Sequence, residues 1–587
     1  MKQLLVELKL DSPVAGQMAA VAAEYASGKY RRLLIHMFSG IADEAGLVRA
    51  AAEIRRCCGT DLIVGTMSAG EIKDAKLMNT GVLVSAILFE DTDIQVLRID
   101  DIKGNEVEVG RRVRQALDDI PDLKAAELIF PGTQTDTQQM FSEISLCRRE
   151  IDIFGGYPGG HRLNSPEHFI FNDTGAMYNT MLVVTYAGKN LHLDVDKSIG
   201  WEALGLPFKV TRAEGKHLIE LDGRPAAEVY EKFLHIDRKK HNNAEEAFEF
   251  PLLASQNGED RLRSTVHIEE DGSLWLHGFV NDGMDIYLSY GDPTRIVEVV
   301  NQRLAALRGF KPQVVLLYSC VVRKTFWEDF VDMEMEPFER MCSTSGFHTW
   351  GEILRNRQTG ELGENNITLL SIAMREGEAP QADLPPLRID DTVLRGQASV
   401  LKRLTRLVTT TMAELQRAHN TLKTMAERDA LTGLYNRGKI EALIEESLGC
   451  DGCVSLVMAD LDFFKRINDT YGHEAGDSVL REFSAIVQNA IKGYPGASAG
   501  RWGGEEFFVV LPGVEEAGVN DFAQRINKTV DSFSFSGVGH LTVSQGIITV
   551  RTCPDHKRVY TQVDDALYAA KAAGRNQVVQ APTMVMH

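Results

Sequence analysis

About the first 375 residues alternate short apolar runs with segments of helical spacing. Such runs are typical of buried strands, and the segments between them are typical of helices that pack on a sheet. The alternation predicts an α/β fold. At ~100–200 residues per domain, this length predicts more than one domain. The apolar runs lie at residues 33–38, 61–65, 82–89, 128–130 and 181–185.

The last quarter of the chain mixes the same two periods. Residues 454–459 and 507–511 are apolar runs that indicate buried strands, and residues 541–550 are extended and β-branched. Apolar residues at helical spacing between these runs predict a helix. The segment is therefore predicted to form a separate βα-type domain. The helical positions are Val479, Leu480, Phe483, Ile486, Val487 and Ala490.

A heptad pattern precedes that domain. Its apolar residues fall mostly on alternating three- and four-residue steps, the spacing of a two-chain coiled coil. Thr411 and Ala418 weaken the seam, which would let it adopt two registers and transmit a signal. The alternative is a single amphipathic helix packed on its own domain. Residues 376–386, rich in Pro, Glu and Ala, indicate a linker. The seam consists of Leu394, Leu401, Leu404, Val408, Thr411, Leu415, Ala418, Leu422 and Met425.

Acidic residues and glycines gather at the predicted strand ends of the last domain. Asp460 ends an apolar run, where a carboxylate can reach a ligand at the sheet edge. Gly503 and Gly504 allow positive φ in a hairpin and leave no Cβ to obstruct a phosphate. Glu505 and Glu506 then face opposite sides of the following strand. Carboxylates such as Asp460 and Glu505 suit Mg²⁺, which completes its shell with phosphate and water. A metal-triphosphate site is predicted.

Together these motifs resemble the GGDEF family, the diguanylate cyclases that condense two GTP into cyclic di-GMP. The resemblance covers residues 429–580, about a quarter of the chain. It implies a central, mostly antiparallel sheet flanked by helices, as in cyclases and polymerase palms. It also implies one GTP per domain, so two copies must meet in a homodimer to form product. The matching stretches are residues 429–437, 460–477, 501–507, Lys571 and residues 574–576.

The resemblance implies a role for each matching residue. Asp460, the carbonyl of Leu461 and Glu505 would hold Mg²⁺ or Mn²⁺. Glu506 would assist deprotonation of the attacking 3′-hydroxyl, and Lys465 and Arg501 would complete the catalytic set. The chemistry is in-line attack on an α-phosphate with pyrophosphate leaving, so catalysis is mostly positioning and charge stabilisation.

The resemblance also implies the nucleotide contacts. Asn468 and Asp477 would read the guanine edge, and Lys465, Lys571 and Arg575 would neutralise the triphosphate. The remaining residues expected beside the nucleotide are Phe463, Phe464, Gly503 and Gly504. Phe463, Phe464 and His473 are interpreted as mainly structural.

One stretch departs from the family pattern. Many of these cyclases carry Arg-x-x-Asp just before the hairpin, where paired charges bind the cyclic product and stop the enzyme. Here the corresponding residues are Tyr494-Pro495-Gly496-Ala497. With no guanidinium or carboxylate at that spot, no product-inhibition site is predicted.

Glycine-rich loops follow short apolar segments in the N-terminal part. Residues 65–72 and 155–160 place small residues at probable strand ends. This is similar to the FIST family, a bacterial sensory module, although Thr66-Met67 departs from the more usual Cys-Ser. The second half of such a module resembles residues 198–201, 221–226, 318–323 and 346–353. The predicted domains are residues 1–218 (FIST N-terminal), 219–376 (FIST C-terminal), 377–428 (linker and coiled coil) and 429–581 (GGDEF).

The FIST resemblance implies a small-molecule ligand. Amino acids are favoured, and haem or nitric oxide is the alternative. Several histidines that precede the linker could ligate haem iron, but none has a haem-attachment spacing. Arg323 and Glu352 would pair with the carboxylate and amine of an amino acid, and Ser68 and Glu71 lie in the first glycine-rich loop. An internal ion pair between Arg323 and Glu352 is equally consistent with the sequence.

Composition narrows the function classes. The net charge of −20 argues against nonspecific binding to DNA or anionic membranes. No run of about 18 apolar residues occurs, and Glu7 and Lys9 interrupt the start, so a cytoplasmic protein without a span or signal peptide is predicted. Eight cysteines suggest no disulfide framework; Cys450 and Cys453 indicate a redox-sensitive loop more than a zinc site.

Two functional classes remain open. The first is a ligand-regulated diguanylate cyclase, and the second is a protein that binds GTP or a small ligand without turnover. The intact set of Asp460, Glu505, Glu506 and Lys571 favours the enzyme.

Overall fold

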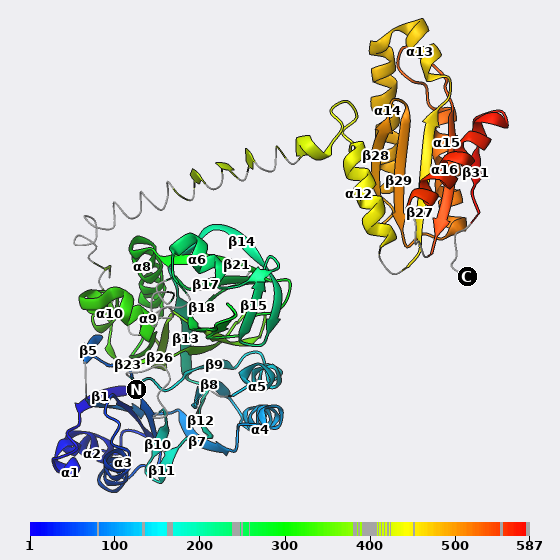
Figure 1. Cartoon of the computed structure of the whole chain (residues 1–587). Coiled ribbons are helices and arrows are strands. Elements are labelled where there is room, and N and C mark those ends of the chain that lie inside the picture. Colours follow the sequence, from blue (N-terminus) through cyan, green and yellow to red (C-terminus); the bar gives the residue numbers. More distant parts are fainter. Residues whose placement is uncertain are drawn as a thin grey trace. The chain divides into compact units, whose positions relative to one another are not determined.

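A computed structural model of the chain divides into two compact units, Met1–Met412 and Ala413–His587 (Figure 1). The structure describes residues 1–78, 81–131, 135–160, 168–237, 247, 250–256, 259–379, 384, 388–389, 408, 410–411, 414–415, 417–418, 422, 424–449, 452–551 and 556–582.

The first unit contains three six-stranded sheets with one shared topology. Each has a parallel pair at its centre and antiparallel neighbours on both sides. The first sheet has the order β1 (Lys2–Glu7), β6 (Val82–Phe89), β2 (Arg32–Ser39), β3 (Ile63–Met67), β10 (Ile170–Asn172), β11 (Gly175–Met177). The second has the order β7 (Asp93–Asp100), β12 (Thr180–Ala187), β8 (Leu123–Ile129), β9 (Asp152–Gly156), β24 (Glu352–Arg355), β25 (Leu362–Asn365). The third has the order β13 (Leu191–Ser198), β26 (Leu369–Glu376), β22 (Val314–Cys320), β23 (Ser343–Thr349), β4 (Glu71–Lys73), β5 (Lys76–Met78).

The outer hairpin of each sheet is exchanged between repeats. After its second parallel strand, each repeat sends a two-stranded hairpin to another repeat's sheet and then returns to finish its own. Hairpin β4–β5 passes from the first repeat to the third, β10–β11 from the second to the first, and β24–β25 from the third to the second. The exchange is cyclic, so residues distant in sequence meet wherever a hairpin docks.

Each sheet has helices on one face and the shared core of the unit on the other. The central core takes side chains from all three sheets, among them Phe38, Phe154 and Phe347. Helix α3 shows how the sequence fixes an element: Asp43 caps its start by accepting the Gly46 amide, and Gly59 ends it with φ +69°. The helices are α1 (Val14–Gln17), α2 (Ala19–Ala26), α3 (Glu44–Cys58), α4 (Glu106–Asp119), α5 (Thr137–Ile144), α8 (Pro293–Phe310), α9 (Val321–Trp327), η1 (Glu328–Phe330) and α10 (Val331–Glu339).

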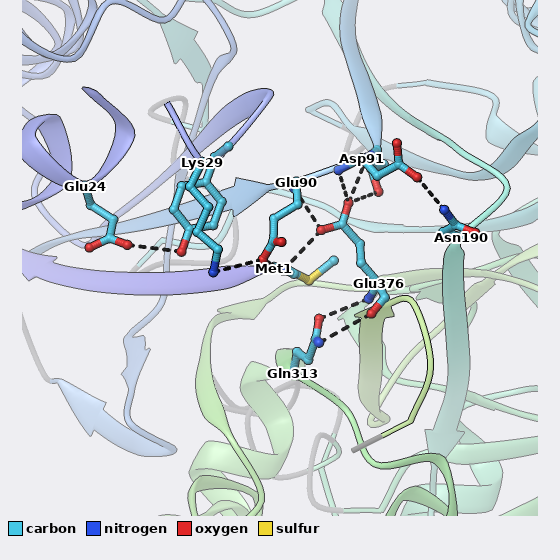
Figure 2. Close-up of polar contacts among 10 residues, drawn as sticks. Met1, Glu24, Lys29, Glu90, Asp91, Asn190, Gln313 and Glu376 are labelled. Carbon is cyan, nitrogen blue, oxygen red and sulfur yellow. Dashed lines mark hydrogen bonds and ion pairs between the residues drawn. The ribbon is translucent and has the colours of Figure 1, made fainter. Parts of the chain in front are cut away.

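The turns that join the repeats lie together around Glu376, at the end of β26 (Figure 2). Its carboxylate accepts the backbone amides of Glu90 at 2.9 Å and Asp91 at 3.0 Å, in the turn between the first two repeats. The Asn190 side chain, between the second and third repeats, donates to Asp91 at 2.5 Å. Glu376 thus ties the first turn to the strand that leads toward the linker.

The third repeat carries a large insertion between β13 and β22. It forms an antiparallel sheet with its own apolar core, and helix α6 (Glu228–Leu234) lies among its described residues. The predicted boundary at residues 218 and 219 falls within this sheet, and the predicted domain boundaries stay predictions. Its strands are β14 (Trp201–Glu214), β15 (His217–Leu221), β16 (Arg224–Pro225), β17 (Leu252–Gln256), β18 (Glu259–Arg263), β19 (Thr265–Ile268), β20 (Leu274–Leu276) and β21 (Asp285–Gly291).

The second unit has a five-stranded sheet with helices packed against it, and its pairs are antiparallel except the last. This confirms the predicted mixed α/β, mostly antiparallel architecture, and the predicted helix is α14, whose buried positions include Val479 and Phe483. The strand order is β28 (Ser498–Gly503), β29 (Glu506–Pro512), β27 (Val454–Leu461), β30 (Val543–Val550), β31 (Val578–Gln580). The helices are α12 (Arg437–Leu448), α13 (Phe464–Tyr471), α14 (His473–Ile491), α15 (Glu516–Ser532) and α16 (His556–Ala572).

The described positions of the predicted seam are helical and exposed. Leu415 and Leu422 are each 65% exposed, and Met425 is 71% exposed. Exposed apolar residues at heptad spacing favour a partner chain over packing on the helix's own domain. Leu394, Leu401 and Leu404 lie outside the described residues, as does Cys450. Within the described part of the chain, no helix is long and apolar enough to cross a membrane.

Candidate active site and sensory site

Strand pairing brings the predicted acidic residues together. β27 and β29 are antiparallel neighbours, and in their register Asp460 is the direct partner of Glu506. Directly opposite residues have Cβ atoms about 4.5–5.5 Å apart. Glu505 immediately precedes β29, and its carbonyl accepts the Leu461 amide at 3.4 Å. Three carboxylates therefore meet where β27 ends.

Lys571 supplies the countercharge from α16. Its Nζ lies 2.7 Å from Asp460 Oδ2. Burial raises the pKa of Asp460, while Lys571 opposes the shift and Glu505 adds to it. Burial also raises the pKa of the half-buried Glu506 carboxyl, and the Asp460 charge adds to that rise. A more basic Glu506 is better able to accept a proton.

The hairpin glycines leave room beside these carboxylates. Gly504 has φ +54°, the left-handed conformation that favours glycine, whereas Gly503 does not use a positive φ. A Cβ added at either position would meet no atom within 4 Å. The space over the hairpin is thus open to an incoming phosphate.

Arg501 holds the hairpin rather than facing that space. Its Nε donates to the Gly504 carbonyl at 2.9 Å, and its Nη1 lies 3.3 Å from Asp429 Oδ1. The same Asp429 carboxylate accepts the amide and hydroxyl of Thr432 at 2.9 and 2.7 Å. Arg501, expected in the catalytic set, therefore connects the hairpin to the opening turn of the domain.

Asp462 has a structural role that the sequence analysis did not predict. Its carboxylate accepts the hydroxyls of Thr542 and Ser544, both at 2.7 Å, and the Asn576 amide at 3.1 Å. Arg575 Nε lies 3.9 Å from it. This buried side chain links β27 to β30 and to the loop after α16. The only sequence signal was the second acid of Asp-x-Asp.

The expected nucleotide residues lie on α13, α14 and the loop after α16. Asn468 and Asp477 are half-buried, and a Cβ on Gly476 would clash with Asn468 Oδ1, so glycine there lets α13 and α14 approach. Phe464 is buried, as expected for a structural residue. Phe463 differs from the mainly structural expectation: it is 54% exposed, and the Arg575 guanidinium lies 4.5 Å from its ring. Lys465 is exposed.

The donor set fits a hard divalent cation that keeps open positions. Asp460 and Glu505 supply carboxylates, and Leu461 supplies a carbonyl at the same strand end. Among the described residues, no three His, Cys, Asp or Glu side chains form a metal cage. An ion held here has to complete its shell with water and phosphate, as Mg²⁺ usually does.

The spot of the expected inhibitory motif does contain a guanidinium. Arg525, on α15, donates to the Tyr494 hydroxyl at 2.5 Å, and the Tyr494 ring packs edge-on against Phe522. The expectation that no guanidinium is available there is wrong, because a side chain distant in sequence reaches it. Residues 494–497 themselves still lack the paired charges.

Two of the predicted sensory residues are occupied by internal contacts. Arg323 is fully buried, forms an ion pair with Glu334, and donates to the carbonyls of Ile199 at 2.8 Å and Ile367 at 3.0 Å. Glu352 is also fully buried and accepts hydroxyls from its own repeat. Arg323 forms its ion pair with Glu334. The structure therefore argues against ligand binding by Arg323 and Glu352 and also against an ion pair between these two residues.

Ser68 and Glu71 lie where the β4–β5 hairpin leaves the first repeat. The Ser68 hydroxyl accepts the Gly70 amide at 3.0 Å. Glu71 is fully buried, and within the described part of the chain neither carboxylate oxygen has a hydrogen-bond partner. Burial raises the pKa of Glu71 to about 7, against opposing effects from its own amide, the Gly40 amide, Ser68 and Lys324.

Comparison with known proteins agrees with this division. Residues 33–224 match the FIST N domain, residues 226–355 the FIST C domain, and residues 426–577 the diguanylate cyclase, GGDEF domain. Diguanylate cyclase DgcM of Escherichia coli (strain K12) is 36% identical over 174 residues, covering 29% of this chain and 42% of that protein. Response regulator PleD of Caulobacter vibrioides is 38% identical over 167 residues, covering 26% and 36%.

A solved structure is similar over the same region. The coiled coil and GGDEF domain of DgcB from Caulobacter crescentus shares 29% identity at a TM-score of 0.29, covering 31% of this chain and 100% of that one. The chain spans less than half the length of DgcM or PleD. From these matches, the chain carries FIST N and FIST C domains followed by a C-terminal GGDEF domain.

Proposed function

We propose that this protein is a diguanylate cyclase that condenses two GTP into cyclic di-GMP and two pyrophosphates, under the control of its FIST module. The observation that carries the proposal is the pairing of Asp460 with Glu506 across β27 and β29, with Lys571 Nζ 2.7 Å from Asp460. GGDEF diguanylate cyclases are generally dependent on a divalent metal, and we propose Mg²⁺ or Mn²⁺ here.

The acidic residues divide into metal binding and proton transfer. Asp460, Glu505 and the Leu461 carbonyl would hold the ion, which when bound neutralises triphosphate charge and polarises the α-phosphate. Glu506 takes the proton of the attacking 3′-hydroxyl, and its raised pKa suits that role. The oxygen forms a bond to the α-phosphorus as the bond to pyrophosphate breaks. A second such transfer closes the ring.

The cations neutralise the rest of the triphosphate. Lys571 exchanges its contact with Asp460 for a phosphate oxygen, so the site keeps a countercharge whether nucleotide is present or not. Lys465 and Arg575 add charge from the α13 side, and Asn468 and Asp477 read the guanine edge. Arg501 acts as a positioning residue through Gly504 and Asp429.

Two copies of the chain supply the two nucleotides. Each cyclase unit holds one GTP, so the 3′-hydroxyl in one must face the α-phosphate in the other. The exposed side chains of Leu415, Leu422 and Met425 support a helical seam that holds two chains together. A short connection of this kind commonly gives effective concentrations in the millimolar range.

The FIST module is proposed to bind a small ligand and to change the cyclase rate through the linker helix. An amino acid is the first candidate, and haem or nitric oxide is the alternative. A ligand acts only through its differential affinity for two arrangements of the helix. Haem binding would give a Soret absorption in protein purified from haem-supplied cells, which an amino acid cannot produce.

The enzyme assignment is tested by product analysis. Purified full-length protein is incubated with GTP and MgCl₂ or MnCl₂, and the products are separated by chromatography and weighed by mass spectrometry. Cyclic di-GMP and pyrophosphate in a one-to-two ratio support the proposal. GTP binding without product in either metal, across protein concentrations that include the dimer, would instead identify a non-catalytic nucleotide-binding protein.

A further inference from the structure

Two repeats of the sensory unit place a glutamate at the same structural position. Residues 65–72 and 346–353 both read Gly-x-x-(Ser/Thr)-x-Gly-Glu-Ile, and each runs from the second parallel strand of a repeat into its exchanged hairpin. Their turns match in detail: Gly70 donates its amide to the Ser68 hydroxyl, and Gly351 donates its amide to the Thr349 hydroxyl, both at 3.0 Å.

The surroundings of the two glutamates match as well. Beside Glu352, the Cys320 amide donates to the Thr368 carbonyl at 3.0 Å. In the first repeat the Gly40 amide donates to the Gly81 carbonyl at 3.1 Å, and a Cβ on Gly40 would lie 3.1 Å from Glu71 Oε1. Gly40 and Gly81 of the first repeat therefore correspond to Cys320 and Thr368 of the third.

The two carboxylates differ in what they bond. Glu352 accepts the Thr349 hydroxyl at 2.7 Å, the Thr368 hydroxyl at 2.6 Å and the Thr368 amide at 3.3 Å. Glu71 is equally buried, yet both of its oxygens lack a hydrogen-bond partner within the described residues. Where the third repeat has the Thr368 hydroxyl bonded to Glu352, the first repeat has Gly81, which carries no side chain.

An unpaired buried carboxylate is costly for the fold, so its retention calls for an explanation in function. The Ser68 hydroxyl and the amides of Glu71 and Gly40 lie near enough to lower the pKa of Glu71, but burial outweighs them, and within the described residues none meets hydrogen-bond geometry with its carboxylate. Lys324 Nζ donates to the Ala69 carbonyl at 2.7 Å, and its charge lowers the pKa of Glu71 by less than burial raises it. His348 packs beside Gly70, and neither of its ring nitrogens has a partner among the described residues. Burial lowers the pKa of His348 to about 3, so its ring is neutral.

We propose that Glu71 is the anchor for the ammonium group of a small amine ligand, which takes the place of the Thr368 hydroxyl of the third repeat. This rests on the proposed sensory function of the FIST module. An ammonium offers three donors to a carboxylate that has none, and it also cancels the buried charge. An anionic ligand would be repelled, and a metal ion would need more ligands than one carboxylate. Gly40 and Gly81 carry no side chain where the third repeat has Cys320 and Thr368, and the flexible end of Met78 lies 3.2 Å from the position of a Cβ on Gly81.

The anchor is placed where a ligand can influence the linker. Glu71 begins the β4–β5 hairpin, which docks on β23 in the third sheet. That sheet also contains β26, whose last residue, Glu376, precedes the linker. The hairpin is held from outside by the Leu77 amide, which donates to Asp332 at 2.7 Å. Glu71 is fully buried, so an amine enters only as this hairpin moves, and that motion shifts the sheet leading to the cyclase.

The experiment uses full-length protein and a defined set of amines: methylammonium, ethanolamine, glycine and alanine, each against its N-acetyl form. The readouts are the melting temperature of the sensory unit and the rate of cyclic di-GMP formation. At saturating amine the wild type should gain about 2–5 °C, and the N-acetyl compounds should have no effect. Glu71→Gln should lose this gain, and Glu352→Gln should keep it, because Glu352 already has its donors.

A filled variant tests the same idea without knowledge of the natural ligand. Gly81 has no positive φ, and a Cβ there would meet only the flexible end of Met78, so Gly81→Thr is compatible with the fold. The new hydroxyl should bond Glu71, raise the melting temperature without ligand and abolish the amine response. The proposal is overturned if no amine in the set stabilises the wild type, or if the gain persists in Gly81→Thr or Glu71→Gln. GTP turnover in all variants separates these outcomes from a failure of the cyclase assignment.

Discussion

The two units of this protein hold their acidic residues in different ways. In the cyclase unit, Asp460 and Glu506 lie at the end of a strand with Lys571 as countercharge and open space over the hairpin. In the sensory unit, Glu71 and Glu352 are buried where an exchanged hairpin docks on another sheet, and only Glu352 has its donors. We therefore propose turnover for the cyclase carboxylates and ligand binding for Glu71, whereas Glu352 is held by its own repeat. Substitutions in the two units should affect different measurements.

The sharpest test of this difference is Glu506→Gln. The amide cannot accept the 3′-hydroxyl proton, so the rate of cyclic di-GMP formation should fall about 10²–10⁴-fold. The melting temperature should stay unchanged, because the Glu506 side chain makes no hydrogen bond to another residue within the described part of the chain. Glu445→Gln, at an exposed position on α12, is the matched control and should keep full activity. A variant that unfolds, or that keeps more than a tenth of the rate, would break the comparison.

Disruption of the helical seam should have the second-largest effect on the rate of cyclic di-GMP formation. Leu415→Asp combined with Leu422→Asp places charges on the two most regularly spaced exposed leucines of the described seam. Loss of association replaces an effective concentration near ~1 mM by the bulk value, so the rate at micromolar protein should fall about 10²–10³-fold. Activity should recover partly as protein concentration rises, because the catalytic residues are untouched.

Light scattering and rate measurements over a range of protein concentrations check this prediction. Thr410→Asp, off the seam on the same helix, is the control. If the double variant stays dimeric with an unchanged rate, another surface holds the two chains together.

The pH dependence of stability should distinguish the sensory carboxylates. Burial raises the pKa of Glu71 to about 7 and that of Glu352 to about 8, against 4.5 in the unfolded chain. The folded protein thus holds these protons more tightly, and its stability should fall as pH rises from about 5 to 8, by roughly 2–4 kcal/mol for each of the two carboxyls. Lys324 near Glu71 and Arg323 near Glu352 reduce the shifts without removing them.

Urea unfolding followed by tryptophan fluorescence over this pH range checks the slope. Glu352→Gln should remove the larger part of it, and Glu71→Gln the smaller part. Buried neutral His277 and His348 act in the opposite sense below about pH 6.5, so variant and wild-type curves are compared directly. Parallel curves for wild type and both variants would show that neither carboxyl titrates as its burial implies.

Asp460 and Asp462 allow the same comparison within one strand end. Asp462→Asn leaves the Asn576 amide facing an amide group, and the free energy of unfolding of the cyclase unit should drop by about 1–3 kcal/mol. Asp460→Asn should leave stability unchanged or higher while removing metal-dependent turnover, because burial, together with the charges of Glu505 and Asp462, outweighs the favourable contact of Asp460 with Lys571. Chemical denaturation and activity measured on both variants separate the two roles. Equal losses of stability in the two variants would contradict this division of roles.

The sequence was sufficient where function depends on residues close together along the chain. Asp460 belongs to one short motif and Glu505 and Glu506 to another, and the resemblance of both motifs to the GGDEF family predicted that they converge, as the pairing of β27 with β29 brings about. The partners of Asp462 did not follow, because Ser544 meets it only through the pairing of β27 with β30, and Asn576 reaches it from the loop after α16. In the sensory unit, hairpin exchange joins residues nearly 300 positions apart, as with Glu71 and Phe347. No local pattern reports such a contact. The ion pair of Arg323 with Glu334 spans only 11 positions, but the sequence left open ligand binding or an internal pair with Glu352 and did not point to Glu334.

The smallest expected effect concerns the spot beside the missing inhibitory motif. Arg525 bonds Tyr494 at an exposed surface, so Arg525→Ala should change the free energy of unfolding by less than about 1 kcal/mol. Without the paired charges in residues 494–497, wild-type progress curves should stay linear as cyclic di-GMP accumulates, and Arg525→Ala should give the same curves. Arg525 nevertheless brings a guanidinium to Tyr494, the first residue of the stretch that departs from the family pattern. A plateau in the wild type that disappears in Arg525→Ala would mean that this residue, brought in from α15, replaces the arginine absent from the motif.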